Sequence, residues 1–221
     1  MQTDLSLKYI SRLASDKNAP LLLLIHGYGS NEEDLFSFVP QLDPGIHVIS
    51  LRAPYDMQPY GAAWYAIDYN ADRAKFSDLD QARASMATLR KFLGEVTVKH
   101  SLKPSSINAL GFSQGAILAM ALALSDPGLF KNVVGMSGYL NEDLVEDYEG
   151  LEARFRESEN PTNFFISHGT MDQVIPFAWA TRTQPIMEKL NVDYVFKEYP
   201  IGHGVSPDNF YDMKTWLEKR L

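Results

Sequence analysis

The fold is decided by the stretch INALGFSQGAILAM, residues 107–120. Its first four residues form a short apolar run of the kind that makes a buried strand, and the residues after Gly115 form an apolar helix. Between them stands Gly111-Phe112-Ser113-Gln114-Gly115, a G-x-S-x-G pattern. A strand, a tight turn carrying serine and a helix together form a nucleophile elbow, which lifts the serine hydroxyl above the sheet. The stretch therefore predicts Ser113 as a catalytic nucleophile.

The same alternation of short apolar runs and longer helical stretches continues along the chain. The runs predicted as further buried strands are Leu21–Ile25, Ile46–Leu51, Val133–Met136, Phe164–Ser167 and Tyr194–Phe196. Helices are predicted over Asn31–Val39, Leu79–Val98, Gln114–Leu124 and Phe177–Leu190, and from about Pro207 to the C-terminal end. This order predicts an α/β fold with a mostly parallel central sheet and helices on both faces. Leu5–Ile10 is a candidate extra edge strand. No linker-like stretch divides the chain, so residues 1–221 are expected to form one domain.

Composition excludes several classes of protein. The 221 residues carry 28 acids against 20 bases, a net charge of −8. This balance disfavours binding to nucleic acids or to anionic membranes, both of which need cationic side chains. Because the chain has no cysteine, disulfides, iron–sulfur clusters, zinc sites built on cysteine and a thiol nucleophile are ruled out. The first residues hold no apolar signal-peptide core, and no apolar run approaches the length of a membrane span. A cytoplasmic protein without stable membrane association is expected.

A serine nucleophile needs a base, and the base needs an acid that orients it. In this class of fold the chain order is serine, acid, histidine. His203, in Gly202-His203-Gly204, follows the last predicted strand and is the expected base. Asp172 follows the strand before it and is the expected acid. Its competitor Asp193 begins a strand and should lie at the opposite edge of the sheet, while His168 is expected to brace the acid loop.

The loop after the first buried strand predicts the oxyanion hole. It reads His26-Gly27-Tyr28-Gly29. Its glycines let the main chain turn so that the N–H of Tyr28 can face the site beside the N–H of Gln114. The loop lacks the third glycine of a dinucleotide-binding motif, and no lysine completes a P-loop. The histidines also lack metal-ligand spacing, so neither a metal nor a cofactor is expected.

Taken together, these segments resemble the phospholipase/carboxylesterase family of α/β-hydrolases, which includes acyl-protein thioesterases and bacterial carboxylesterases. The resemblance extends over essentially the whole chain. It implies a minimal cap, the triad Ser113, Asp172 and His203, and a homodimer as a plausible assembly. The family's H-G-D-x-D motif reads HGTMD here, with Thr170 as a departure and Asp172 kept. Ala53-Pro54 followed by residues 64–68, WYAID, resembles a loop that helps to line the family's acyl pocket. Trp64 and Tyr65 are therefore expected to bind substrate, and Asp68 closes that motif.

The resulting expectation is a serine hydrolase that cleaves small-molecule carboxylic esters or thioesters without a cofactor. One alternative is a peptidase or amidase on the same fold. Another is a catalytically inactive hydrolase fold used as a binding module. Residues 138–161, which contain eight acids and two bases, are expected to form a solvated helical excursion, because they lack the apolar face of a lipid-docking lid.

Overall fold

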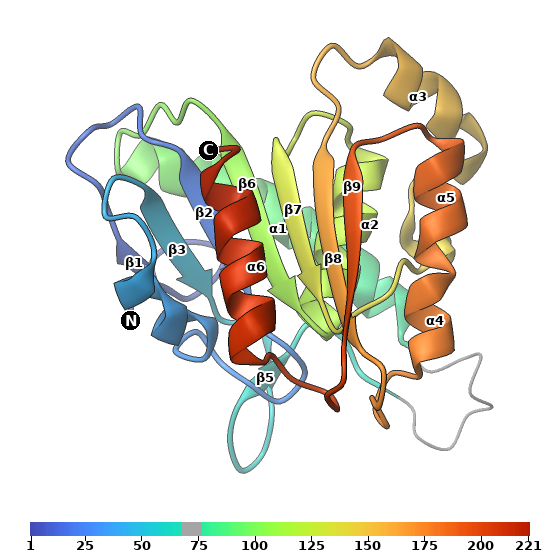
Figure 1. Cartoon of the computed structure of the whole chain (residues 1–221). Coiled ribbons are helices and arrows are strands. Elements are labelled where there is room, and N and C mark those ends of the chain that lie inside the picture. Colours follow the sequence, from blue (N-terminus) through green and yellow to red (C-terminus); the bar gives the residue numbers. More distant parts are fainter. Residues whose placement is uncertain (68–76) are drawn as a thin grey trace.

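A seven-stranded sheet forms the centre of the computed structural model, which describes residues 1–67 and 77–221 (Figure 1). In spatial order its strands are β1 (Tyr9–Arg12), β3 (His47–Leu51), β2 (Leu21–Ile25), β6 (Ile107–Phe112), β7 (Asn132–Met136), β8 (Asn163–Gly169) and β9 (Tyr194–Tyr199). β1 pairs antiparallel with β3, and every other pair is parallel. The predicted mostly parallel α/β architecture is confirmed. The loops that follow β2, β6, β8 and β9 consequently gather at one edge of the sheet.

Helices cover both faces of this sheet, which explains why its strands are apolar without alternation. Leu21, Leu23 and Ile25 of β2 pack in the core cluster that contains the buried faces of α1 (Leu79–Lys99) and α2 (Gln114–Ser125). Leu22 and Leu24 point the other way, toward α6 (Pro207–Glu218) and the 3₁₀ helix η1 (Leu35–Gln41). Figure 1 shows α6 on the near face and α1 and α2 behind the strands.

Three predicted elements differ from the structure. The helix expected over Phe177–Leu190 is two helices, α4 (Phe177–Thr181) and α5 (Thr183–Lys189). Pro185 accounts for the break, since its ring excludes the carbonyl four residues earlier and it has no N–H to donate. The helix expected over Asn31–Val39 is the shorter 3₁₀ helix η1, because the Asn31 side chain caps a local turn by accepting from the N–H of Glu33. The edge strand runs over Tyr9–Arg12 instead of Leu5–Ile10.

One hairpin was not predicted as an element, and the expected helical excursion consists of three short helices. β4 (Tyr55–Asp56) and β5 (Ala62–Ala63) form a short hairpin that lies against the loop after β2. Residues 138–161 contain the 3₁₀ helices η2 (Glu142–Leu144) and η3 (Tyr148–Gly150) and the helix α3 (Leu151–Glu157).

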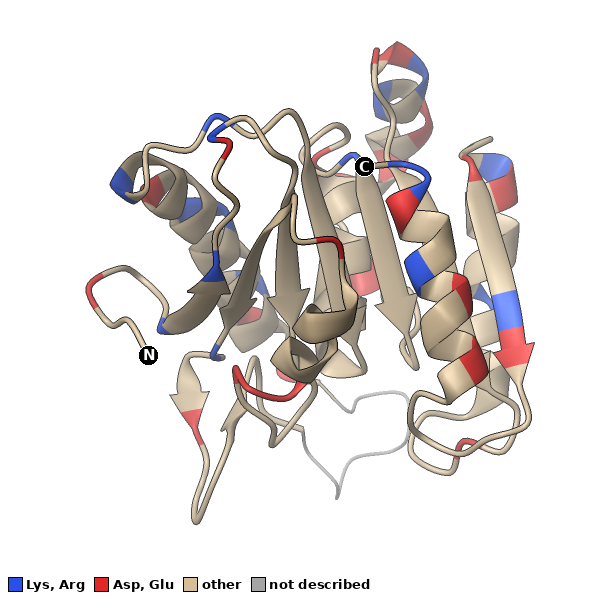
Figure 2. Ribbon diagram, turned by 60° about the vertical axis from the view of Figure 1, so that its left-hand side comes forward, with Lys and Arg blue, Asp and Glu red and all other residues tan. Residues whose placement is uncertain are grey.

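The excursion over residues 138–161 turns its apolar side chains inward. Leu144, Leu151 and Phe155 are buried in the core. The other positions of α3 are mostly charged, as the red and blue segments of its ribbon at the top of Figure 2 show. The expected solvated helical excursion is confirmed. Within residues 1–67 and 77–221, no helix combines the length and apolarity needed to cross a membrane.

Candidate active site

Ser113 lies between the end of β6 and the start of α2. Its backbone has φ 52° and ψ −116°, a strained conformation for a residue with a side chain. The surrounding backbone holds it there: its N–H donates to Met136 O over 2.9 Å, and its carbonyl accepts from Ile117 N over 3.1 Å. Strained, fully hydrogen-bonded backbone at a strand-to-helix turn is the geometry of a nucleophile elbow.

The two glycines of the G-x-S-x-G pattern allow this close packing. A Cβ on Gly115 would stand 2.0 Å from the carbonyl oxygen of Ile25, and one on Gly111 would stand 2.5 Å from the carbonyl oxygen of Gly115. Both obstacles are backbone atoms, which cannot rotate away. Any larger residue would push α2 off the end of β2 and move Ser113 with it.

Gly115→Ala is therefore expected to lower the free energy of unfolding by about 3 kcal/mol, in the range of overpacked sites. Thermal or denaturant unfolding measures the change. Gly94→Ala is the matched control: Gly94 lies on α1, and a Cβ there meets no atom within 4 Å. That variant should keep or raise stability by up to about 1 kcal/mol, since glycine weakens a helix interior. Equal stability of Gly115→Ala and the wild-type protein would contradict this account.

The three predicted triad residues come together from β6, β8 and β9. The Ser113 hydroxyl lies 2.9 Å from Nε2 of His203, and Nδ1 of His203 lies 2.7 Å from Oδ2 of Asp172. The Asp172 side chain is fully buried, and that of His203 is 17% exposed. The Phe112 ring packs against the imidazole, with centroids 5.1 Å apart. In this arrangement the serine O–H can donate to Nε2 while Nδ1–H donates to the carboxylate.

The acid loop fixes the carboxylate of Asp172 on both oxygens. Oδ1 accepts from the backbone N–H groups of Val174 and Ile175, over 2.8 and 2.9 Å. Nε2 of the fully buried His168 lies 3.2 Å from Oδ2 and 2.9 Å from Ile175 O. His168 thus lies where a brace for this loop was expected. The rival acid Asp193 lies at the other edge, where its Oδ2 accepts from Arg220.

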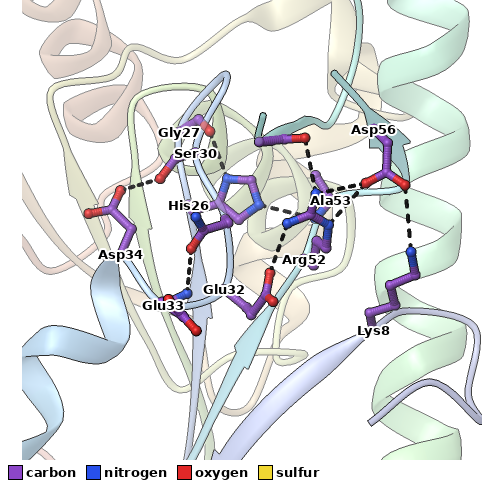
Figure 3. Close-up of polar contacts among 12 residues, drawn as sticks. Lys8, His26, Gly27, Ser30, Glu32, Glu33, Asp34, Arg52, Ala53 and Asp56 are labelled. Atoms are coloured by element: carbon purple, nitrogen blue, oxygen red, sulfur yellow. Dashed lines mark hydrogen bonds and ion pairs between the residues drawn. The ribbon is translucent and has the colours of Figure 1, made fainter. Parts of the chain in front are cut away.

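The loop over residues 26–34, called the 26–34 loop below, runs beside Ser113, since a Cβ on Gly27 would stand 3.3 Å from Ser113 Cβ. Arg52 binds this loop through Glu32 (Figure 3). The guanidinium donates to Glu32 over 3.2 Å, to Asp56 over 2.8 Å and to Gly61 O over 3.1 Å. Arg52 and Glu32 form a partly buried ion pair that was not predicted, because the two residues belong to no recognisable sequence motif.

The β4–β5 hairpin also pairs with the 26–34 loop. Gly29 N donates to Ala62 O over 3.0 Å, and Ala62 N donates to Ser30 O over 2.8 Å. A Cβ on Gly61 would stand 2.0 Å from Gly29 O, so the hairpin approaches the loop as closely as glycine allows. Together with Arg52, these bonds fix the outer half of the loop.

Trp64 and Tyr65, both expected to contact substrate, are placed differently. Tyr65 lines the cavity at Ser113. Trp64 is fully buried and does not line it, because its indole points into the core, where Nε1 donates to His26 O over 2.9 Å. The expectation for Trp64 was wrong. Asp68, the end of the same motif, lies outside the described residues.

The side chain of Gln114 has a role that its backbone assignment did not suggest. Its Oε1 accepts from Trp64 N over 2.8 Å, and its Nε2 donates to Tyr65 O over 2.7 Å. The residue after the nucleophile therefore fixes the segment that forms one wall of the cavity. The sequence alone could not predict this role, because the partners of the glutamine, the backbone groups of Trp64 and Tyr65, are about 50 residues away and are brought to it only by the fold.

A cavity of about 880 Å³ opens at Ser113 and His203. Tyr28, Gln114 and Asp172 also line it. Its apolar and aromatic lining residues further include Tyr65, Ile67, Phe112, Ile117, Tyr139, Val174, Ile175, Pro176, Phe177 and Trp179. Tyr139 and Trp179 meet edge to face, with ring centroids 5.3 Å apart. Burial raises the pKa of Tyr65 and of Tyr139, so both hydroxyls stay protonated near neutral pH. The cavity suits an apolar group attached to a reacting carbonyl.

A known family and several known proteins match this chain over most of its length. The model of a family described as Phospholipase/Carboxylesterase matches residues 12–221. Acyl-protein thioesterase 1 of Aspergillus fumigatus is 29% identical, with 93% of this chain and 90% of the relative covered. Acyl-protein thioesterase 1 of Emericella nidulans is 24% identical, with 93% and 92% covered. The crystal structure of esterase PE8 superposes with a TM-score of 0.82 at 26% identity, covering 97% of this chain and 99% of that one. The Bacillus cereus carboxylesterase superposes with a TM-score of 0.79 at 21% identity, covering 97% and 95%, and at that identity the likeness shows the fold alone.

Proposed function

Because the chain belongs to the phospholipase/carboxylesterase family, we propose that it hydrolyses carboxylic esters or thioesters through an acyl-enzyme on Ser113. The observation that carries this proposal is the continuous hydrogen-bonded chain from Ser113 Oγ through His203 to Asp172, at 2.9 and 2.7 Å. The Ser113 end of this hydrogen-bonded series opens into a cavity lined mainly by apolar side chains. The family relatives named as thioesterases and esterases support the same reaction class.

In the first half-reaction Ser113 Oγ attacks the acyl carbon while its proton moves to Nε2 of His203. The carbonyl oxygen becomes an oxyanion, which the backbone N–H groups of Tyr28 and Gln114 stabilise. Collapse of this intermediate expels the alcohol or thiol, which takes the proton from His203. Asp172 holds the imidazole in the Nδ1–H tautomer and stabilises its charged form.

In the second half-reaction a water molecule takes the place of the leaving group. His203 accepts a proton from it as the water oxygen attacks the acyl carbon, and a second oxyanion forms in the same hole. Its collapse returns the proton to Ser113 and releases the carboxylic acid. Every proton transfer runs between groups of this chain, the substrate and water, so the proposed cycle needs no cofactor.

Residues 1–221 are inferred to act as one domain, because a single sheet takes its strands from Tyr9 to Tyr199. The cytoplasmic location and the homodimer stay predictions. Cell fractionation tests the first, and sedimentation of the purified protein tests the second.

A substrate panel tests the reaction class. Matched oxygen esters, thioesters, lysophospholipids and amides that share one acyl group are assayed with the purified protein. Turnover of esters or thioesters, with amides at background, is the expected result. Preferential cleavage of the amides would favour the peptidase or amidase alternative, and no turnover of any of them would favour the inactive binding module.

Substrates that form micelles should give no jump in rate at their micellar limit. The excursion over residues 138–161 has no free apolar face, since Leu144, Leu151 and Phe155 are buried in the core, and a lipid-docking lid needs such a face. The acids of this segment would also be repelled by anionic headgroups. Short to medium acyl esters are therefore the expected substrates. Initial rates measured across the micellar limit check this, and a sharp increase there would contradict it.

A further inference from the structure

His26 stands at the end of β2, at the start of the 26–34 loop, and is 1% exposed. Its ring makes two hydrogen bonds to backbone groups (Figure 3): Nδ1 lies 2.7 Å from the carbonyl oxygen of Gly27, and Nε2 lies 3.1 Å from the N–H nitrogen of Ala53. The ring therefore bridges the Gly27–Tyr28 peptide of the 26–34 loop and the chain just beyond the neighbouring strand β3. The proposed catalytic cycle does not use this buried histidine.

The two partners determine the tautomer of the ring. The Ala53 N–H can only donate, so Nε2 must present its lone pair, and the Gly27 carbonyl can only accept, so Nδ1 must carry the proton. Burial is the main cause that lowers the pKa of His26, against the opposing effects of the Gly27 bond, Asp34 and Glu32. Arg52, the other charged group that acts on the ring, also lowers it. The neutral ring is thus the stable form near neutral pH.

The Gly27 bond sets the direction of the next N–H. In a trans peptide the carbonyl of one residue and the N–H of the next point to opposite sides of the same rigid plane. A Gly27 carbonyl turned toward the His26 ring therefore turns the Tyr28 N–H away from it. Gly27 and Tyr28 both line the cavity, and a Cβ on Gly27 would stand 3.3 Å from Ser113 Cβ. This peptide begins beside the nucleophile.

We propose that His26 is a positioning residue that orients the Gly27–Tyr28 peptide, so that the Tyr28 N–H points at the oxyanion. The inference rests on the proposed function and goes beyond it, since it assigns the preorganisation of the oxyanion hole to a histidine outside the triad.

The contacts of the hairpin and of Arg52 act on other parts of the loop. Hairpin bonds hold Gly29 and Ser30, and Arg52 holds Glu32, but none of these contacts reaches the Gly27–Tyr28 peptide. Apart from the ring, the Gly27 carbonyl accepts from Ser30 N, over a longer 3.3 Å. Gly27 forms one side of this peptide, and a glycine gives the backbone there more rotational freedom than another residue would. Of these two bonds to the Gly27 carbonyl, the one from Nδ1 is the shorter, at 2.7 Å.

Two substitutions separate the two ring nitrogens. The side-chain amide of His26→Asn reaches the position of Nδ1 and can still donate to Gly27 O, whereas that of His26→Gln reaches the position of Nε2 and cannot. His26→Gln is expected to lose about 100-fold in kcat with KM nearly unchanged, as when one oxyanion donor is lost, and His26→Asn to stay within about tenfold of the wild-type kcat. His47→Gln is the matched control. His47 is equally buried and accepts from a backbone N–H through Nδ1, but it lies at the start of β3, at the opposite edge of the sheet.

The control should lose stability and keep kcat. Three results would overturn the inference. His26→Asn and His26→Gln could lose kcat equally, or the kcat of all three variants could fall in proportion to their Tm. The third is a change in KM with kcat unaltered. A measurement on the unaltered protein covers the case in which the variants do not fold. Nitrogen-15 NMR of the imidazole should show His26 neutral with the proton on Nδ1, and a proton on Nε2 would overturn the inference.

The inference and the proposed function fail separately. If His26→Gln turns over at the wild-type rate while Ser113→Ala is inactive, the role of His26 is wrong and the acyl-enzyme mechanism stands. If Ser113→Ala retains activity, the mechanism itself is wrong.

Discussion

Ser113→Ala is expected to lower the rate of ester hydrolysis by about four to six orders of magnitude, the range seen when a triad nucleophile is removed. The substitution deletes the oxygen that lies within hydrogen-bond distance of His203 Nε2, at 2.9 Å. The fold should survive, because Ser113 lies on the cavity wall and the loss of a hydroxyl there opens no hole in the core. The backbone strain at φ 52° is common to serine and alanine.

Turnover of a chromogenic ester and the thermal unfolding temperature, measured on the same preparation, check this prediction. Ser101→Ala is the matched control, since Ser101 has the same φ of 52°. It follows α1 at the opposite edge of the sheet, so its activity should equal that of the wild-type protein. If Ser113→Ala retained more than a small fraction of activity while folded, the nucleophile assignment would be wrong.

Asp172→Asn is expected to lower kcat by about 10⁴-fold, the loss known for the same change in another triad hydrolase. Its amide nitrogen can occupy the position that now accepts from His203 Nδ1 over 2.7 Å. Oδ1 already accepts from two backbone N–H groups, so the amide oxygen is drawn to that side and the nitrogen faces the imidazole. A donor there forces His203 into the tautomer with the proton on Nε2, which cannot accept from Ser113.

Steady-state kinetics of Asp172→Asn beside Asp193→Asn measures this effect. Asp193 is the acid that competes with Asp172 in the sequence, and in the structure it pairs with Arg220 away from the cavity. Asp193→Asn should keep the wild-type kcat. A loss in Asp193→Asn, or near wild-type turnover by Asp172→Asn, would refute the assignment of the acid.

Local patterns were enough to predict the parallel sheet and the three residues that converge on its edge. Strands that are buried on both faces leave continuous apolar runs, and the strain at Ser113 requires small neighbours, so both features are visible as residue types. The end of each parallel strand is then known to meet the others at one edge. For this reason Ser113, Asp172 and His203 could be brought together although up to 90 residues separate them.

Features that depend on long-range packing could not be predicted. Trp64 and Tyr65 are adjacent aromatics that are both almost fully buried, and only the path of the chain decides that Tyr65 lines the cavity and Trp64 does not. The hydrogen bond between His26 and Ala53 and the ion pair of Arg52 and Glu32 join segments that are distant in sequence, and no residue spacing predicts such contacts. Pro185 could have predicted the break between α4 and α5. The apolar periodicity continues across it, however, and predicted a single helix.

Labelling with a fluorophosphonate, followed by mass spectrometry of the digested protein, tests the central claim most directly. Such a probe phosphonylates a serine only when a neighbouring base activates it. The account predicts one phosphonyl group per chain, located on Ser113, with loss of esterase activity in proportion to labelling and little labelling of Asp172→Asn. A protein that hydrolyses esters without being labelled, or that is labelled at another serine, would contradict it.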